Sequence, residues 1–398
     1  MTPNKILVAN IGSTSFKFRL IEMPSERVLA KGGVDRIGSA ESNYKITIGD
    51  GPEKKGTGSF PDYDAAIALV EKILEEFGGF GGLAAVGFKP VGARNVSGTQ
   101  LLDERVLKAM EEFNTLLPAH NPPYIAAVRS FHRTHPNLPC IGTFETAFYD
   151  QVPVENRRYP VPLDWEEKYG IRRYGFHGAS HRFVTQRAAE LRGEKNLRII
   201  SCHLGGSSSI AAVRNGVAID SSWGMTPQSG LPQNNRVGDF DVFALIYLAR
   251  DLGLGIDAVE KALTTESGLK GLSGLSTGDV RDILDAAAAG NENAKVAIDV
   301  FVGQIRKFIG QFLVELDGAD VLVFTAGIAE NNPTLREQIC ANLSFCGLEL
   351  DLEKNAKTGA EEAVISTPAS KIEVRVIPTN EELIIARNAW QKLSEINS

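Results

Sequence analysis

Apolar runs followed by small-residue loops mark the start of each half of the chain. Residues 6–9 form a short apolar run, and residues 16–20 alternate apolar with basic side chains at the period of two of a β-strand. Gly12 lies between them in a Ser/Thr-rich segment. This pattern predicts a strand, a tight turn and a second strand.

The same arrangement returns in the second half of the chain. Residues 198–204 predict a strand, residues 205–209 are glycine and serine, and residues 210–213 predict the returning strand. Asn215-Gly216 then gives a strong hairpin signal. Two such units predict a duplicated domain, with chance similarity as the alternative.

Helical patterns fill the space between these units. Apolar residues recur at helical spacing within 62–77 and 294–316. Thr379 followed by Glu382 matches a capping box ahead of a helix over 383–393, which would leave Glu381 to point elsewhere. Asn332 and Pro333 predict another helix start. Strands alternating with helices predict an α/β fold.

Composition narrows the class of protein. The chain has 398 residues, 43% hydrophobic and 23% charged, as expected for a globular protein of about two or three domains. Its net charge of −7 disfavours nucleic acid or an anionic membrane as the main partner. The 39 glycines indicate many turns or ligand-approaching loops.

Cysteine usage and the N-terminus predict a cytoplasmic protein. Four cysteines without a C-x-x-C spacing indicate free thiols rather than a disulfide framework. The first residues lack the apolar core of a signal peptide, and no apolar run is long enough to span a bilayer.

Small-residue loops offer the first candidate chemistry. Asn10, Ser13, Ser15 and Lys17 combine free backbone amides with a cation, a pattern that suits phosphate oxygens. An ordinary β-turn with a solvated lysine explains the same residues. The 205–209 loop has the same ambiguity.

Other candidate residues are charged or titratable. His177 is flanked by glycines, and Arg236 stands beside glycine and carboxylates, as an anion clamp would. An apolar strand over 321–324 leads into a glycine turn, common in both nucleotide sites and structural turns. Carboxylates able to hold Mg²⁺ are Glu145, Asp239, Glu330 and Glu381.

Seven short motifs in one order make the chain resemble the acetate/propionate kinase family of the actin-like ATPase superfamily, from Ile6 to about Lys392. These motifs are Asn10-x-Gly-Ser-x-Ser-x-Lys17, His120-Asn-Pro-Pro123, Tyr174-Gly-Phe-His-Gly178, Cys202-His-Leu-Gly205, Arg236-x-Gly-Asp239, Gly327 with Glu330-Asn331, and Thr379-Asn-Glu-Glu382.

The resemblance implies reversible transfer of the ATP γ-phosphoryl group to a short-chain carboxylate, giving an acyl phosphate and ADP. It implies Mg²⁺ (or Mn²⁺) and a homodimer. It also implies two actin-like (ribonuclease H-like) α/β domains around a cleft. The first would comprise residues 1–146 with 383–398, and the nucleotide-binding second would comprise 147–382.

Residue roles follow from the same resemblance. It implies transfer catalysis by His177, Arg236 and Glu145, and metal binding by Asn10 and Glu381. It places substrate contacts at Lys89, Val91, Arg94, Ala119, Phe176 and Pro227. It implies nucleotide or phosphate binding by Asn10, Ser13, Ser15, Lys17, His203, Gly205, Gly206, Ser207, Asp279, Val280, Arg281, Gly327, Ile328, Ala329, Glu330 and Asn331.

Several positions depart from the family pattern. Lys89 stands in place of the family's substrate arginine, with Arg94 nearby in the chain, and Glu145 replaces its catalytic aspartate. Ala119 replaces a leucine of the acyl pocket, which adds space for a larger acid. Further departures on the nucleotide side are Gly206, Val280 and Ala329.

These departures leave two alternatives open beside an acyl kinase. One is a catalytically weakened nucleotide-binding paralogue. The other keeps the chemistry and uses a different phosphoryl donor, such as pyrophosphate.

Overall fold

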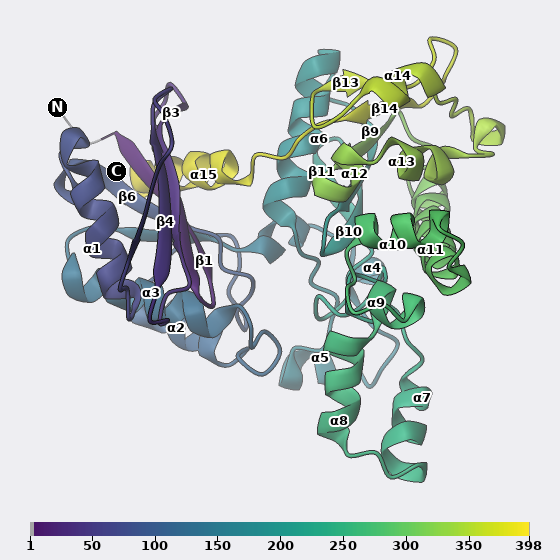
Figure 1. Ribbon diagram of the computed structural model, residues 1–398, viewed down its shortest axis with the longest axis horizontal. Coiled ribbons are helices and arrows are strands. Elements are labelled where there is room, and N and C mark those ends of the chain that lie inside the picture. The colour runs from purple at the N-terminus through teal and green to yellow at the C-terminus, as the bar shows by residue number, and fades with distance from the viewer. Residues whose placement is uncertain (1–3, 398) are drawn as a thin grey trace. The chain divides into compact units, whose positions relative to one another are not determined.

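The computed structural model describes residues 4–397, which divide into two compact units (Figure 1). The first comprises the described residues up to Asp150 together with those from Asn380 onward, and the second comprises Gln151–Thr379. Each unit has its own sheet and its own hydrophobic core.

The sheet of the first unit has the strand order β5-β4-β3-β2-β1-β6-β8-β7. Strands β1 to β5 form an antiparallel meander, whereas β1, β6 and β8 run parallel. The strands are β1 (Lys5–Gly12), β2 (Ser15–Glu22), β3 (Arg27–Asp35), β4 (Ser42–Ile48), β5 (Lys54–Gly58), β6 (Leu83–Phe88), β7 (Thr99–Leu101) and β8 (Cys140–Thr143).

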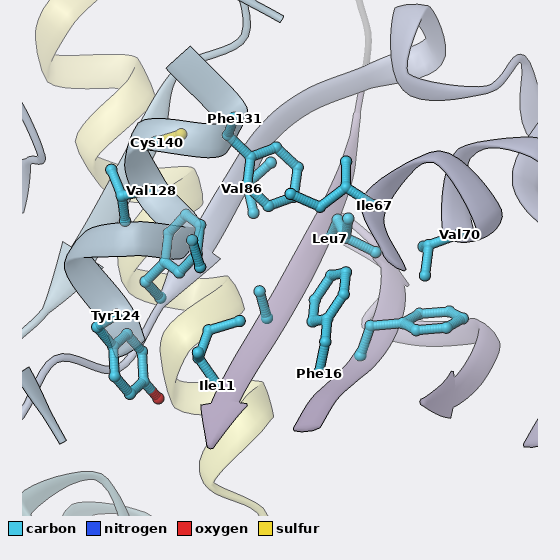
Figure 2. Close-up of a cluster of buried hydrophobic side chains, with 14 of the residues drawn as sticks. Leu7, Ile11, Phe16, Ile67, Val70, Val86, Tyr124, Val128, Phe131 and Cys140 are labelled. Atoms are coloured by element: carbon cyan, nitrogen blue, oxygen red, sulfur yellow. The ribbon is translucent and has the colours of Figure 1, made fainter. Parts of the chain in front are cut away.

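Helices cover both faces of this sheet. They are α1 (Tyr63–Ile73), η1 (Leu74–Phe77), η2 (Phe80–Gly82), α2 (Glu104–Glu111), α3 (Asn121–Thr134), η3 (Glu145–Tyr149) and α15 (Glu381–Asn397). Figure 2 shows the core beneath α1 and α3, where Leu7 and Phe16 of the sheet meet Ile67 and Phe131 of the helices.

Helix α15 packs against β1, β6 and β8 on the opposite face. Successive side chains of a strand point to opposite faces, so Gly87 faces away from the core that holds Val86. A Cβ at Gly87 would lie 3.0 Å from Ile385. The missing side chain therefore lets the returning helix approach the sheet closely.

The sheet of the second unit has the order β11-β10-β9-β12-β14-β13. Asn215 and Gly216 turn between β10 and β11 with φ of 54° and 80°, the positive values of a type I′ hairpin. The strands are β9 (Arg198–Leu204), β10 (Ser208–Arg214), β11 (Val217–Ser221), β12 (Val321–Thr325), β13 (Ala363–Val364) and β14 (Glu373–Val376).

The longest helix of the second unit is α11, which buries Phe301, Ile305 and Phe312 in the core. The helices are α4 (Val154–Arg157), α5 (Asp164–Tyr169), α6 (Gly178–Arg192), α7 (Val242–Ile246), η4 (Tyr247–Asp251), α8 (Ile256–Lys261), η5 (Ala262–Glu266), α9 (Gly268–Ser273), α10 (Val280–Ala288), α11 (Glu292–Glu315), α12 (Gly327–Asn331), α13 (Pro333–Cys340), η6 (Ser344–Cys346) and α14 (Leu352–Lys357).

The two sheets repeat one topology. In the first unit, β3-β2-β1 are antiparallel neighbours and β1 continues into parallel β6 and β8. In the second, β11-β10-β9 are antiparallel and β9 continues into parallel β12 and β14. The predictions of an α/β fold and of an internal duplication are confirmed.

The predicted capping box at the start of α15 is wrong. The backbone N–H of Leu383 donates to Asn380 Oδ1 at 3.3 Å, while Thr379 Oγ1 is buried without a hydrogen-bond partner among the described residues. The helix therefore begins at Glu381, two residues earlier than predicted. Glu382 lies 3.7 Å from Arg19 instead of closing a cap.

Candidate functional site

Three element termini of the first unit bring a lysine between two carboxylates. Lys89 follows β6, Glu145 opens η3 just after β8, and Glu381 is the first residue of α15. Lys89 Nζ lies 2.8 Å from Glu145 Oε1 and also donates to Glu381 Oε2. Because β6 and β8 are parallel, their carboxyl ends meet at one edge of the sheet.

This cluster is largely removed from solvent, with side-chain exposures of 18% for Lys89, 5% for Glu145 and 18% for Glu381. Burial disfavours the charged ammonium, but the negative charges of Glu145 and Glu381 outweigh it and hold the Lys89 pKa well above its ordinary value. Lys89 is therefore a permanent cation at physiological pH.

Asn10 and Tyr124 adjoin this cluster. Tyr124, at the start of α3, donates through its hydroxyl to Asn10 Oδ1 at 3.3 Å. Burial raises the pKa of Tyr124 to about 12, so its hydroxyl keeps its proton. The sequence analysis missed Tyr124, because nothing local distinguishes it from a core tyrosine.

The side-chain oxygen atoms of Asn10, Glu145 and Glu381 are of the kind that binds a hard divalent cation. Two carboxylates and one amide oxygen suit Mg²⁺, which keeps several waters or phosphate oxygens for itself. Within residues 4–397 no group of three or more His, Cys, Asp or Glu side chains could hold a metal ion on its own. Glu145, Glu381 and Asn10 are therefore the residues of the first unit that could hold such an ion, with phosphate oxygens completing its coordination.

Both basic side chains predicted to bind the substrate carboxylate are already paired with acidic side chains of the protein. Lys89 contacts Glu145 and Glu381, and Arg94 pairs with Glu112 at 3.1 Å with 37% of its side chain exposed. An ammonium has three N–H donors, so Lys89 can bind both acids and still donate once more.

The predicted phosphate loop is the β1–β2 turn. Gly12 pairs with Ser15 across the turn, and Tyr63 donates to the Gly12 carbonyl at 2.6 Å. Lys17 lies directly opposite Asn10 in the β-register and is exposed. Ser13, at the tip of the turn, is exposed as well. The turn thus presents hydroxyls and one cation beside Asn10.

His177 in the second unit is held by aromatic and hydroxyl contacts. It precedes α6 in a left-handed conformation with φ of 55°, which costs energy for a residue with a side chain. Its ring stacks on His203 at 3.9 Å and lies 4.2 Å from Trp223. Its Nδ1 is 2.9 Å from Ser209 Oγ.

Arg236 is tied to the glycine-serine loop. Its Nη1 lies 3.3 Å from Gln233 Oε1 and 3.5 Å from Ser207 Oγ, and Ser207 donates to the same Gln233 oxygen at 2.7 Å. Burial lowers the pKa of Arg236, although arginine stays protonated at physiological pH. Gln233 is a further residue that sequence reasoning missed.

A cavity of about 370 Å³ in the second unit collects many of the predicted nucleotide residues. Asn234 and Asn332 also line it, which the sequence analysis did not predict. The lining residues are Gly205, Gly206, Asn234, Asp279, Val280, Arg281, Gly327, Ile328, Asn331 and Asn332.

Four predicted nucleotide residues of the second unit do not line this cavity: His203, Ser207, Ala329 and Glu330. Ala329 is fully buried and packs in the core of the second unit. Glu330 Oε1 accepts the backbone N–H of Ala326 at 2.6 Å and so braces its own turn. The roles of Ala329 and Glu330 in nucleotide binding stay a prediction.

The predicted acyl-pocket residues are divided between the units. Val91 and Ala119 belong to the first unit, where Val91 is buried and Ala119 exposed. Phe176 and Pro227 are buried in the second unit, with the Phe176 ring 5.4 Å from that of Trp223.

The duplicated α/β fold thus carries a cation–carboxylate cluster in one unit and a ligand-sized cavity in the other. A family model for the acetokinase family matches residues 5–387. The acetate kinase of Carboxydothermus hydrogenoformans is 44% identical over 395 residues, covering 97% of this chain and 98% of the relative. The Bacillus subtilis acetate kinase is 42% identical over 391 residues, with the same shares covered.

Solved structures agree with these relatives. Porphyromonas gingivalis acetate kinase superposes with a TM-score of 0.88 at 37% identity, covering 98% of this chain and 99% of that one. A propionate kinase from Francisella tularensis gives 0.89 at 31% identity, covering 97% and 98%. The chain belongs to the acetokinase family.

Family and fold establish the enzyme class. The protein is an acyl kinase, a phosphotransferase with a carboxyl group as acceptor, and its predicted actin-like fold is confirmed. The two alternative functions find no support among the relatives. Over residues 4–397, no helix has the length and apolar character needed to cross a membrane.

Proposed function

We propose that this enzyme transfers the γ-phosphoryl group of ATP reversibly to acetate or a similar short-chain carboxylate. The observation that carries the proposal is the near-complete alignment with acetate kinases, in a chain that keeps Asn10, His177, Arg236 and Glu381. Phosphoryl transfer requires positioning and positive charge around the moving group, and these residues supply both.

His177 and Arg236 are the proposed stabilisers of the transferring group. Arg236 offers a planar fork of N–H donors to phosphoryl oxygens, and His177 offers one ring N–H. The stacking of His177 on His203 supports a fixed ring orientation. We assign Glu145 to the same step, because its contact with Lys89 holds the Glu145 carboxylate in position.

The proposed metal ligands are Asn10 and Glu381, with Glu145 close by. Mg²⁺ bound there would neutralise phosphate charge and orient the β- and γ-phosphates. Ser13 at the tip of the β1–β2 turn, with Ser15 and Lys17 of β2, would contact phosphate oxygens.

The adenosine is proposed to occupy the cavity lined by Gly206 and Ile328. Its volume of about 370 Å³ lies within the range of small-molecule sites. The other proposed contacts are Gly205, Asp279, Val280, Arg281, Gly327 and Asn331, with His203 and Ser207 facing the phosphates.

The proposed contacts of the acid in the first unit are Val91 and Ala119, with Lys89 or Arg94 as the cation for its carboxylate, and those in the second unit are Phe176 and Pro227. Ala119 in place of leucine favours acids larger than acetate.

A coupled assay of acyl phosphate formation tests this function. The parent protein, His177→Ala and Arg236→Ala would be given MgATP with acetate, propionate, butyrate and hydroxylated acids, and a donor panel including pyrophosphate. We expect at least one acid to be phosphorylated with ATP, at a rate about 10²- to 10³-fold above either variant. If no acid exceeds the His177→Ala background, the proposal fails.

We also propose that the two compact units are the two actin-like domains, that the enzyme is a homodimer, and that it works in the cytoplasm. An exposed apolar surface on α7, η4 and α8 supports the dimer, because monomers rarely expose such patches. It includes Val242, Phe243, Tyr247, Leu252 and Ile256. Four free thiols suit a reducing compartment.

A further inference from the structure

A buried row of hydrogen-bonding side chains ends on His177. Ser201 Oγ on β9 lies 2.8 Å from His181 Nδ1 on α6, and His181 Nε2 lies 2.8 Å from Ser209 Oγ on β10. Ser209 Oγ in turn lies 2.9 Å from His177 Nδ1. We call Ser201, His181 and Ser209 the serine–histidine relay, and each of the three is fully buried.

The middle member of the relay is neutral. Burial holds the pKa of His181 well below its ordinary value, and the neighbouring His203 adds to the shift. A neutral imidazole has one N–H and one bare nitrogen. Ser209 could accept from both rings, but its own hydroxyl hydrogen would then have no acceptor among the contacts of the relay. Two arrangements remain, one running in each direction along the relay.

In the first arrangement, Ser201 donates to His181 Nδ1, His181 Nε2–H donates to Ser209, and Ser209 donates to His177 Nδ1. In the second, every hydrogen bond is reversed, and His181 Nδ1–H donates to Ser201. The Ser201 hydroxyl would then need another acceptor.

The surroundings of Ser201 favour the first of the two hydrogen arrangements. Among the described residues, the contact with His181 is the one side-chain hydrogen bond that Ser201 makes. The reversed arrangement would leave its hydroxyl hydrogen buried and unpaired, which is costly. The first arrangement satisfies every donor along the relay.

We propose that the serine–histidine relay fixes the tautomer of His177, so that Nδ1 is bare and Nε2 carries the hydrogen. His177 then presents an N–H donor from a neutral ring, without first gaining a proton. Its stacking on His203 and contact with Trp223 hold the ring plane. Ser201, His181 and Ser209 are positioning residues, and only His177 would touch the phosphoryl group.

The catalytic consequence rests on the proposed function, but the tautomer does not. A donor that is already oriented stabilises transition-state charge without reorganisation. If the tautomer is as stated while no acid is phosphorylated, the proposed function fails and the relay stands.

Nitrogen NMR of the full chain labelled with ¹⁵N-histidine measures the tautomer directly, because a hydrogen-bearing ring nitrogen and a bare one have well-separated shifts. The chain has six histidines, and His177→Ala assigns the signals. We expect Nε2–H and bare Nδ1 for His177 in the parent, and a mixture of tautomers in Ser201→Ala and Ser209→Ala. Hydrogen on Nδ1 of His177 in the parent overturns the proposal.

Kinetics of the same variants provide a second readout. Ser209→Ala and Ser201→Ala should lower kcat about tenfold with little change in KM, because part of the population loses its oriented donor. His181→Gln retains an acceptor and an N–H and should keep more activity than His181→Leu. Ser273→Ala removes another buried hydroxyl of the second unit and serves as the control.

The proposal is also overturned if the His177 shifts and kcat in Ser209→Ala match those in Ser273→Ala.

Discussion

Lys89 balances the negative charges of its two acidic neighbours, Glu145 and Glu381. Without it, Glu145 and Glu381 would place two negative charges together in a poorly solvated corner. Lysine is shorter than the arginine that the family resemblance implies, and glutamate is longer than the corresponding aspartate. The two departures offset one another in length, and Lys89 and Glu145 are in contact.

Lys89→Met should therefore lower the free energy of unfolding by about 3 kcal/mol, because removing one member of a buried pair leaves uncompensated charge. Glu145→Gln should also destabilise. The double variant should lose less than the sum of the two, because the Glu145 charge that Lys89 balances is then absent as well. Urea unfolding measures the cycle, and Lys31→Met, an exposed lysine on β3, is the control. Additive losses would contradict the coupling.

At the scale of elements, the start of α15 places a proposed metal ligand. Asn380 caps the helix, and Glu381 follows it as the first helical residue. Because the cap fixes where the helix begins, it also fixes where Glu381 projects.

Asn380→Ala should cost about 1 kcal/mol of stability, as lost N-caps do. Thr379→Val keeps the shape of a side chain whose hydroxyl is buried and unpaired among the described residues, so it should be neutral or stabilising. Thermal unfolding of both variants checks this. If Thr379→Val lowers the stability more than Asn380→Ala does, Thr379 is the residue that caps the helix.

A second pair of elements, β11 and the end of α11, brings two carboxylates together. Gln311 Nε2 lies 3.1 Å from Asp220 Oδ2 and 3.0 Å from Glu315 Oε1. Burial, followed by the charge of Glu315, raises the pKa of Asp220 from 3.8 to about 7. The folded state therefore holds a proton that the unfolded chain releases at lower pH.

The raised pKa of Asp220 makes the stability of the folded state depend on pH. The stabilisation by protonated Asp220 is complete below about pH 4 and is lost as pH rises to about 7. Asp220→Asn has no carboxyl to ionise and so avoids this loss. The free energy of unfolding of the variant relative to the parent should therefore rise by at least about 1 kcal/mol from pH 4 to pH 8. Unfolding at several pH values measures this, with Asp299→Asn on the exposed side of α11 as the control. Parallel curves for parent and Asp220→Asn would refute it.

At the scale of the whole molecule, the exposed apolar side chains of α7, η4 and α8 are those proposed to form the dimer interface. Phe243 is 73% exposed and Tyr247 54% exposed. Burying such side chains against a second copy would remove apolar area from water.

Phe243→Glu should convert the proposed dimer to a monomer, because a charge in an apolar interface must be desolvated. Sedimentation velocity at several concentrations reports the change. Phe345→Glu makes the same substitution at another exposed phenylalanine of the second unit, 83% exposed, and should leave the dimer intact. A parent protein that is already monomeric would contradict the prediction.

The sequence by itself determined strands β1, β2, β9, β10 and β12, the Asn215-Gly216 hairpin turn, helices α1, α11, α13 and α15, and the family. Period-two alternation, Asn215-Gly216 and the Asn332 cap are local signals, and each depends on hydrogen bonds or burial within a few residues. The motifs also identified the residues proposed for catalysis, because their types and order were enough to show the resemblance.

The tertiary structure alone decided which distant residues meet. Lys89, Glu145 and Glu381 come from the ends of β6, β8 and α15, and the sheet register and the returning helix bring them into one cluster. The relay to His177 likewise needs two strands and a helix at once. Local patterns record which backbone conformation a segment prefers, whereas charge balance and proton placement depend on neighbours that only folding supplies.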